Sequence, residues 1–247
     1  MYAVFFDRLL TGYSLFVHII LASVGMALPI IILLAEYLGI RFNDKQYESI
    51  AKRLSIAFII LFAVGTASGT LIAFELLLVW PKFMALVSQV AILPVYVEVF
   101  AFFMETIFLA MYIYSWDKFK SKMTHLLLGI PVALGAALSA LFITMLNAFM
   151  NTPNGFNIAT YLKNGTITNV MPYAVFSTPS TSLEASHVIS TAYFAGAFIV
   201  IAYAAIMLLK ASDQNKKAYY VKILKLALIV GIIATLLSLV TGRHRGG

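Results

Sequence analysis

The sequence has 247 residues, of which 62% are hydrophobic and only 11% are charged. Soluble domains carry about 25% charged residues, so this composition excludes an ordinary soluble domain and indicates an integral membrane protein. The formal net charge of +7 is typical of Lys- and Arg-rich cytoplasmic loops, and we expect no nucleic-acid partner. Because the chain has no cysteine, disulfides, iron–sulfur clusters and C-x-x-C-H haem attachment are excluded.

Apolar runs of about 20 residues cross a membrane as helices, and the gaps between charged residues divide the sequence into six such runs. The opening residues MYAVFFDRLL are not typical of a cleaved signal, so the first run is expected to be retained. Pro94 divides a long apolar stretch, which places residues 83–93 at the membrane interface. The polar stretch 151–181 is expected to be a surface loop. The predicted spans are 9–37, 54–79, 94–116, 123–150, 183–209 and 221–240.

The predicted fold class is therefore an all-α membrane bundle of about six transmembrane helices, forming a single domain over residues 1–247. Most of the 17 basic residues lie in the connections after the first, third and fifth spans. The positive-inside rule places those connections in the cytoplasm and both termini on the outer side. We expect a multi-pass protein of the plasma membrane, surrounded by lipid.

Two carboxylates occur inside the third predicted span. Glu98 and Glu105 are seven residues apart, which places them on one face of a helix and about 10 Å apart along its axis. Ionisable groups in lipid are costly and usually face the interior of a bundle, where they bind or move something. The pair is typical of a proton path, although each carboxylate could also make a local hydrogen bond that specifies packing.

Two histidines also occur inside predicted spans, His18 in the first and His187 in the fifth. Neutral imidazole is a common axial ligand of haem iron. A membrane histidine can equally act only as a hydrogen-bond partner. Histidine together with buried carboxylates, without cysteine, favours haem or proton chemistry in the membrane.

The remaining ionisable residues near the ends of the spans are expected to be less informative. Glu75, near the end of the second span, is expected to reach the interface or to pair with Lys82. His125 and His244 are expected to be solvated. The small-residue pattern from Gly65 to Gly69 allows close approach of another helix or of a flat ligand.

Several motifs, in the same order, resemble subunit I of the cytochrome bd quinol oxidases. GTLIAFELLLVWPKFM, at 69–84, is similar to the family's GTxxxFELxxxWPxFM region, and EVFAFFME, at 98–105, is similar to EGFAFFxE. WDK at 116–118 is similar to WDR, and NAFMNTP at 147–153 is similar to NGWMQNP. His187 is in the position of the family's haem ligand on helix 5. The resemblance covers almost the whole chain and corresponds to the N-terminal six-helix half of the family.

The resemblance implies a role for each candidate residue. His187 would ligate a low-spin haem b that takes electrons from quinol. His18 would ligate a haem at the site where a high-spin haem b and haem d, or a second high-spin haem, reduce O₂ to water. Glu98 and Glu105 would deliver protons. Glu75 and Asn147, which stand in two of the matched motifs, are further cofactor-binding candidates.

The family continues into an external quinol-binding loop and further helices with a methionine ligand, a carboxylate ligand and a GRQPW motif, none of which is in this sequence. Val99 also replaces the family's glycine after the first glutamate. One interpretation is a half-length oxidase subunit that works with a second subunit and with a polypeptide supplying the remaining helices, and that is inactive without them. A fragment of a longer protein, a haem-binding paralogue without oxidase activity and a haem-free proton-conducting protein remain as alternatives.

Overall fold

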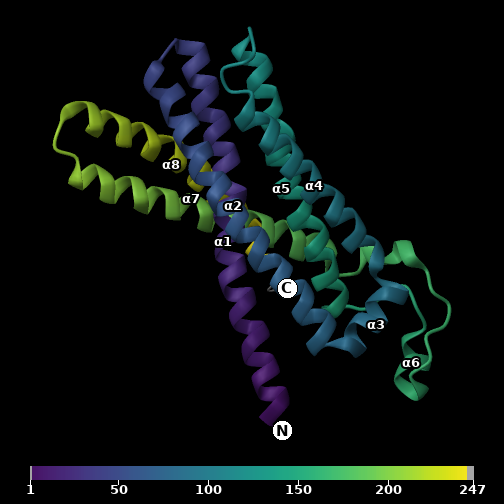
Figure 1. Ribbon diagram of the computed structural model, residues 1–247. Helices are drawn as coiled ribbons and strands as arrows, with labels where there is room; N and C mark the ends of the chain where they lie inside the picture. Colours follow the sequence, from purple (N-terminus) through teal and green to yellow (C-terminus); the bar gives the residue numbers. More distant parts are fainter. Residues whose placement is uncertain (1, 244–247) are drawn as a thin grey trace.

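The computed structural model describes residues 2–243, and within that range the chain is helical and contains no strand (Figure 1). Six helices, α1, α2, α4, α5, α7 and α8, are long and apolar enough to cross a membrane. This confirms the predicted all-α bundle with about six transmembrane helices. The elements are α1 (Tyr2–Phe42), α2 (Lys45–Val79), α3 (Pro81–Val90), α4 (Ile92–Tyr114), α5 (Lys122–Asn151), α6 (Ile158–Asn164), the 3₁₀ helix η1 (Pro172–Ser177), α7 (Thr181–Lys210) and α8 (Gln214–Arg243).

The long helices pack as three antiparallel pairs: α1 with α2, α4 with α5, and α7 with α8 (Figure 1). Helix α1 is central, because it also contacts α5, α7 and α8. Its fully buried face, which includes Ile31 and Ala35, packs in one core with Phe58 of α2 and Ala197 of α7. Gly196 brings α7 directly against the α1 backbone, since a Cβ atom there would collide with the carbonyl oxygen of Ser23.

The break before α4 occurs at Ala91 and not at Pro94. Pro94 lies in the first turn of α4, where its missing N–H removes no helical hydrogen bond. Residues Pro81–Val90 form the separate short helix α3. The polar stretch after α5 is also more ordered than a surface loop: it contains α6 and η1, and Val175 of η1 is fully buried in a second core with Phe149.

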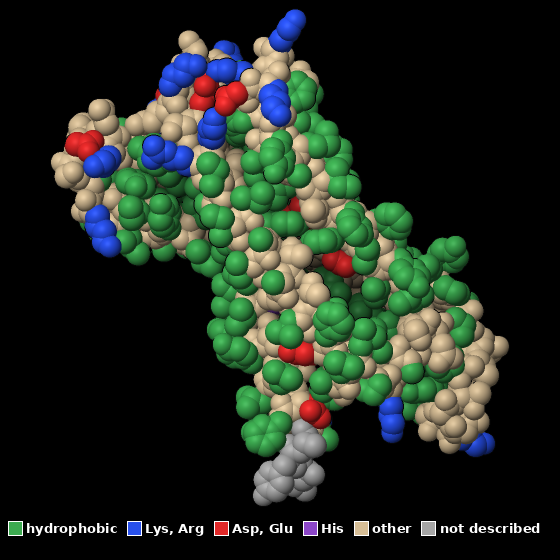
Figure 2. Space-filling model, viewed as in Figure 1, with side chains coloured by type: hydrophobic (Ala, Val, Ile, Leu, Met, Phe, Trp, Pro, Cys, Tyr) green, Lys and Arg blue, Asp and Glu red, His purple; other side chains and the backbone are tan. Residues whose placement is uncertain are grey.

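Basic side chains gather at one end of the bundle, near the turns that join α1 to α2 and α4 to α5 (Figure 2). We call the end that carries the connections 43–44, 115–121 and 211–213 the basic end. Hydrophobic side chains cover the middle of the visible face, as expected for a lipid-facing surface (Figure 2). Helix α2 is the most exposed of the six spans, since only 6% of its most apolar 18-residue segment is buried.

Asp44, in the connection between α1 and α2, links α2 to α8 at the basic end. It is the N-cap of α2, and its Oδ1 accepts hydrogen bonds from the backbone N–H groups of Gln46 and Tyr47. Its Oδ2 pairs with Lys222 Nζ of α8 at 2.5 Å. The hydrogen bond from Lys222 is the main cause that holds the pKa of Asp44 below its ordinary value.

We expect Asp44→Ala to destabilise the bundle by about 1 kcal/mol, because an N-cap side chain contributes about that much. Asp44→Asn should keep the cap and lose only the ion pair with Lys222. A carboxyl group whose pKa is lower in the folded than in the unfolded protein stabilises the fold at pH values above its unfolded-state pKa. This contribution is lost as the pH falls through the folded-state pKa. Thermal unfolding in detergent should therefore depend less on pH below about 4 in Asp44→Asn than in the wild type, and identical acid profiles would contradict the role of the pair.

Candidate functional site

His18 lies on the face of α1 that packs against α2. Its Nδ1 is 2.9 Å from Ser68 Oγ, which itself donates a 2.8 Å hydrogen bond to the carbonyl oxygen of Gly65. Because a hydroxyl group has a single hydrogen, Ser68 must accept from His18. Nδ1 therefore carries the proton, and Nε2 keeps a free lone pair. Gly69 makes room for the ring, since a Cβ atom there would lie 3.0 Å from His18 Cε1.

His187 is held in the same way between α7 and α8. Its Nδ1 is 3.2 Å from Thr241 Oγ1, and this hydroxyl donates to the carbonyl oxygen of Leu237 at 3.0 Å. Thr241 therefore accepts from His187, whose Nε2 has no hydrogen-bond partner among the described residues. Gly242 follows the threonine as Gly69 follows Ser68, and its Cβ position lies 3.4 Å from His187 Cε1. A hydroxyl residue followed by glycine thus orients each histidine, a pattern that the sequence reasoning missed.

Both imidazoles have the hydrogen-bonding pattern that an axial haem ligand needs. Within residues 2–243 no group of three or more His, Cys, Asp or Glu side chains is placed to hold a metal ion. Haem iron takes its equatorial ligands from the porphyrin and needs only axial ligands from the protein. An imidazole whose Nδ1–H is fixed by a neighbouring oxygen and whose Nε2 is free is suited to axial ligation.

Glu75 is buried and does not pair with Lys82 or reach the interface, contrary to the prediction. Its Oε1 accepts a 2.6 Å hydrogen bond from Ser14 Oγ of α1. Its Oε2 is buried and has no hydrogen-bond partner among the described residues. The sequence of α2 does not indicate that Glu75 is buried, because the face of α2 that meets Ser14 depends on how the helices pack. Glu75 and His18 therefore share the interface between α1 and α2.

Glu98 and Glu105 lie on α4, at its interface with α5. Glu98 is half-buried and accepts a 2.6 Å hydrogen bond from Ser139 Oγ of α5. Glu105 is buried beside Gly135, where a Cβ atom would lie 2.8 Å from Glu105 Cβ. The glycine allows α5 to approach the carboxylate closely. The structure describes no hydrogen bond between the two carboxylates, in keeping with their separation by about two turns.

Asn147 is exposed near the end of α5, and no hydrogen bond among the described residues joins it to either histidine. Its Oδ1 accepts from Asn151 Nδ2 at 3.0 Å. Asn151 Nδ2 also contacts both carboxylate oxygens of the buried Glu184, at 3.1 and 3.2 Å. Glu184 lies one turn before His187 on α7 and is a residue that the sequence reasoning missed.

The predicted site residues are thus distributed over the three helix pairs. His18 and Glu75 lie between α1 and α2, Glu98 and Glu105 between α4 and α5, and His187 between α7 and α8. Within the part of the chain that the structure describes, no hydrogen bond joins one of these residues to another. His244 lies outside the described residues.

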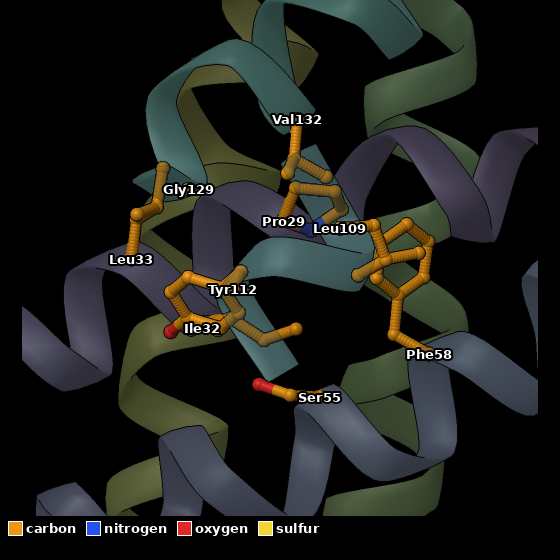
Figure 3. A pocket seen from close by; sticks show the side chains of 9 residues that line it. All are labelled: Pro29, Ile32, Leu33, Ser55, Phe58, Leu109, Tyr112, Gly129 and Val132. Carbon is orange, nitrogen blue, oxygen red and sulfur yellow. The ribbon is translucent and has the colours of Figure 1, made fainter. Parts of the chain in front are cut away.

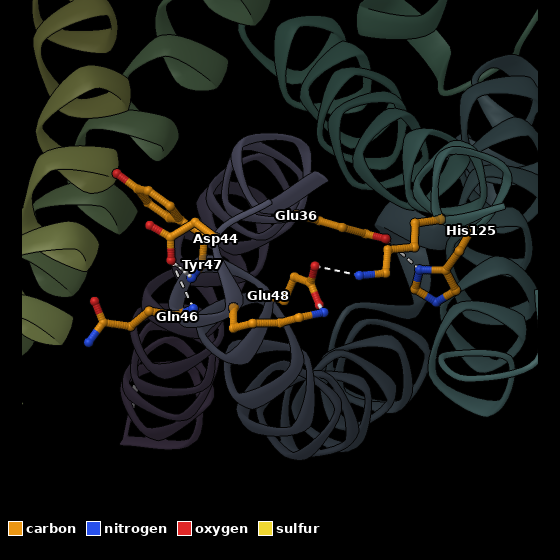
Figure 4. Close-up of polar contacts among 8 residues, drawn as sticks. Glu36, Asp44, Gln46, Tyr47, Glu48 and His125 are labelled. Carbon is orange, nitrogen blue, oxygen red and sulfur yellow. Dashed lines mark hydrogen bonds and ion pairs between the residues drawn. The ribbon is translucent and has the colours of Figure 1, made fainter. Parts of the chain in front are cut away.

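His125 is buried, and the prediction that it is solvated is wrong. Only 2% of its surface is exposed, and its Nδ1 lies 2.6 Å from Glu36 Oε1 of α1 (Figure 4). Its Nε2 lies 2.8 Å from the backbone carbonyl oxygen of Tyr112, whose phenol donates to Glu36 Oε2 at 2.5 Å. We call these three residues the Glu36–His125–Tyr112 cluster. The sequence gives no sign of this cluster, because Glu36 lies far from Tyr112 and His125 in the chain.

A small cavity adjoins this cluster (Figure 3). Its volume is about 10 Å³, close to the least that can hold one water molecule. It lies where α1, α2, α4 and α5 meet, and most of its wall is apolar. Ser55, Leu109, Tyr112 and Val132 are among the residues that line it, and they present only apolar atoms to the cavity.

The chain is similar to known proteins over almost all of its length. A Bacillus subtilis (strain 168) protein named "Putative cytochrome bd menaquinol oxidase subunit I" is 38% identical over 96% of this chain and 53% of its own length. The "Cytochrome bd ubiquinol oxidase subunit 1" of the same organism is 32% identical over 89% of the chain and 45% of its own length. The structure of bd oxidase from Geobacillus thermodenitrificans has a TM-score of 0.89 and 43% identity, covering 97% of this chain and 54% of the other.

The six apolar helices and the buried ionisable residues define a multi-pass membrane protein. The chain belongs to the cytochrome bd terminal oxidase subunit I family, whose model matches residues 6–247. This membership places it in the plasma membrane, as the sequence predicted. The chain spans about half the length of the curated relatives it matches.

Proposed function

We propose that this chain forms the haem-binding and proton-delivering half of a quinol oxidase of the cytochrome bd type, which oxidises quinol and reduces O₂ to water. The observation that carries the proposal is the matched pair of histidines. Each is oriented through Nδ1 by a hydroxyl group of the next helix and keeps Nε2 free. Family membership over residues 6–247 supports the same assignment.

His187 would hold a low-spin haem b, and His18 would hold a haem at the oxygen-reducing site, a high-spin haem b or haem d. Bound haem supplies the one-electron chemistry that carries electrons from quinol to O₂. The contribution of the protein is to fix the two imidazoles. Hydrogen bonds from Nδ1 to Ser68 and Thr241 set the tautomer and the ring orientation before a ligand binds.

Glu98 and Glu105 would hold and pass the protons that O₂ reduction consumes. Both carboxylates lie on one face of α4, and Ser139 can exchange a proton with Glu98 through its 2.6 Å hydrogen bond. Carboxylates at this depth in a bundle are typical of proton relays. Glu75, whose Oε2 is buried without a described partner, and the exposed Asn147 would contact the cofactors.

The rest of the enzyme would come from sequence beyond the matched half of the relatives, together with a second oxidase subunit. That sequence could continue this polypeptide or belong to a separate one, and the described half would be inactive without it. In this proposal the basic end lies in the cytoplasm and both termini lie outside, and the clustering of Lys and Arg at that end supports this orientation through the positive-inside rule. Membrane lipid, quinol and O₂ are the remaining partners.

A reduced-minus-oxidised visible spectrum of the native complex and of the purified chain, followed by haem extraction and typing, tests this function. We expect haem b, with haem d or a second high-spin haem, and quinol-dependent oxygen consumption by the complex. Haem without oxygen consumption would favour a non-oxidase haem protein. No haem in either preparation would overturn the proposal.

A further inference from the structure

A buried carboxylate close to His187 has no role in the function proposed so far. Glu184 lies three residues before His187 on α7, and residues at this spacing are neighbours on the surface of a helix. Only 9% of Glu184 is exposed. An ionisable residue that is buried in a membrane bundle usually acts on a charge or a ligand, so a role for this carboxylate is expected.

The contacts of Glu184 are those of an ionised carboxylate. Asn151 Nδ2 has two hydrogens and donates one of them to Asn147 Oδ1 at 3.0 Å. Its other hydrogen lies between the two carboxylate oxygens of Glu184, with N···O distances of 3.1 and 3.2 Å. A neutral carboxyl group would need an acceptor for its own O–H, and the described residues provide Glu184 with a donor only. Glu184 therefore carries a negative charge.

The first turn of α7 stabilises this charge and holds it in place. Glu184 lies in that turn, where the positive end of the helix dipole favours an anion. Hydroxyl groups fix the turn against the end of α5, because Ser180 Oγ lies 2.8 Å from Thr152 Oγ1. The carboxylate is thus held by α5, while His187 contacts α8 through Thr241.

A fixed, buried charge at this position changes how easily a nearby iron is oxidised. None of the ion pairs among the described residues includes Glu184, and water screens a buried charge less than an exposed one. Haem iron gains one positive charge on oxidation, so a neighbouring carboxylate stabilises the oxidised form. Unit charges about 10–15 Å apart change an equilibrium constant by about 5- to 15-fold at an effective dielectric constant of about 20.

We propose that the negative charge of Glu184 lowers the reduction potential of the haem held by His187. The proposal rests on the ligand role of His187 in the function proposed above. A lower potential makes the reduced haem a stronger electron donor, so its electron passes more readily to the haem at His18. One electron leaves the first haem and enters the second, and no bond forms or breaks at Glu184.

Glu184→Gln in the assembled complex tests this role, because it removes the charge and keeps the shape of the side chain. We expect the midpoint potential of the low-spin haem to rise by about 40–70 mV, which is the 5- to 15-fold change converted at about 59 mV per ten-fold. Glu184→Asp keeps the charge and should stay close to the wild-type potential. A spectroelectrochemical titration of the low-spin absorption band measures the shift.

Two control variants separate the charge from the packing. Ser180→Ala loosens the same junction between α5 and α7 without changing a charge, since it removes the contacts of Ser180 Oγ with Thr152 and with the carbonyl oxygen of Ala148. Asp213→Asn removes a negative charge at the basic end, where Asp213 pairs with Lys216. Both variants should keep the wild-type potential.

The outcomes separate this proposal from the proposed function. A wild-type potential in Glu184→Gln, with haem content intact, would overturn the effect of the charge and leave the oxidase function in place. Loss of haem or of thermal stability in Glu184→Gln, or an equal shift in Ser180→Ala, would assign Glu184 to packing and also overturn it. A wild-type complex without a low-spin haem would overturn the ligand role of His187, and this proposal with it.

Discussion

His187→Ala is expected to remove the low-spin haem signal without unfolding the bundle. The imidazole is only half-buried, and its hydrogen-bond partner Thr241 keeps a second bond to Leu237 after the ring is lost. The loss of Nε2, in contrast, removes the iron ligand proposed for α7. A reduced-minus-oxidised spectrum, together with extracted haem per chain and a thermal unfolding curve, measures both effects.

Thr241→Val provides a graded comparison for the same site. It keeps the ligand but removes the oxygen that orients it, and such supporting contacts change metal affinity by about 10–100-fold. Haem should therefore bind more weakly and still give a low-spin spectrum.

His18→Ala should leave that low-spin signal in place and remove a high-spin one. A wild-type spectrum in His187→Ala would reject the ligand assignment.

Glu105→Gln should slow turnover of the assembled complex by about 10²–10⁴-fold, the usual contribution of a positioned acid or base. Glutamine has nearly the same shape, so the close packing against Gly135 is kept while the transferable proton is lost. Oxygen consumption with excess quinol, recorded across a range of pH, measures the effect. Haem content should be unchanged.

Asp213→Asn is the control for Glu105→Gln. It makes the same chemical change in the exposed connection between α7 and α8, where Asp213 pairs with Lys216, and it should leave turnover unchanged. If Glu105→Gln is as active as the wild type at every pH, Glu105 does not deliver protons. The hydrogen bond of Glu98 to Ser139 would then be a packing contact.

The number and order of the spans could be predicted because the gaps between charged residues can be read from the sequence and compared with the helix length that a bilayer requires. The pairing of the helix faces could not. These helices are apolar on nearly every side, so no polar stripe marks the face that is buried. For this reason the sequence predicts an interfacial Glu75 and a solvated His125, although both are buried and in contact with Ser14 and Glu36. The same lack of a marked face hid Ser68 and Thr241, the partners of the two histidines.

The contact between Glu36 and His125 also has a consequence for how the protein is made. The two residues are 89 positions apart, and ribosomes add about 5–20 residues per second. Helix α1 therefore reaches the membrane several seconds before α5 exists. During that interval the Glu36 carboxyl group has no imidazole partner, and a lone carboxylate is costly at depth. We therefore expect α1 to reach its final depth in the bilayer only when the α4–α5 hairpin has been inserted and has packed against it.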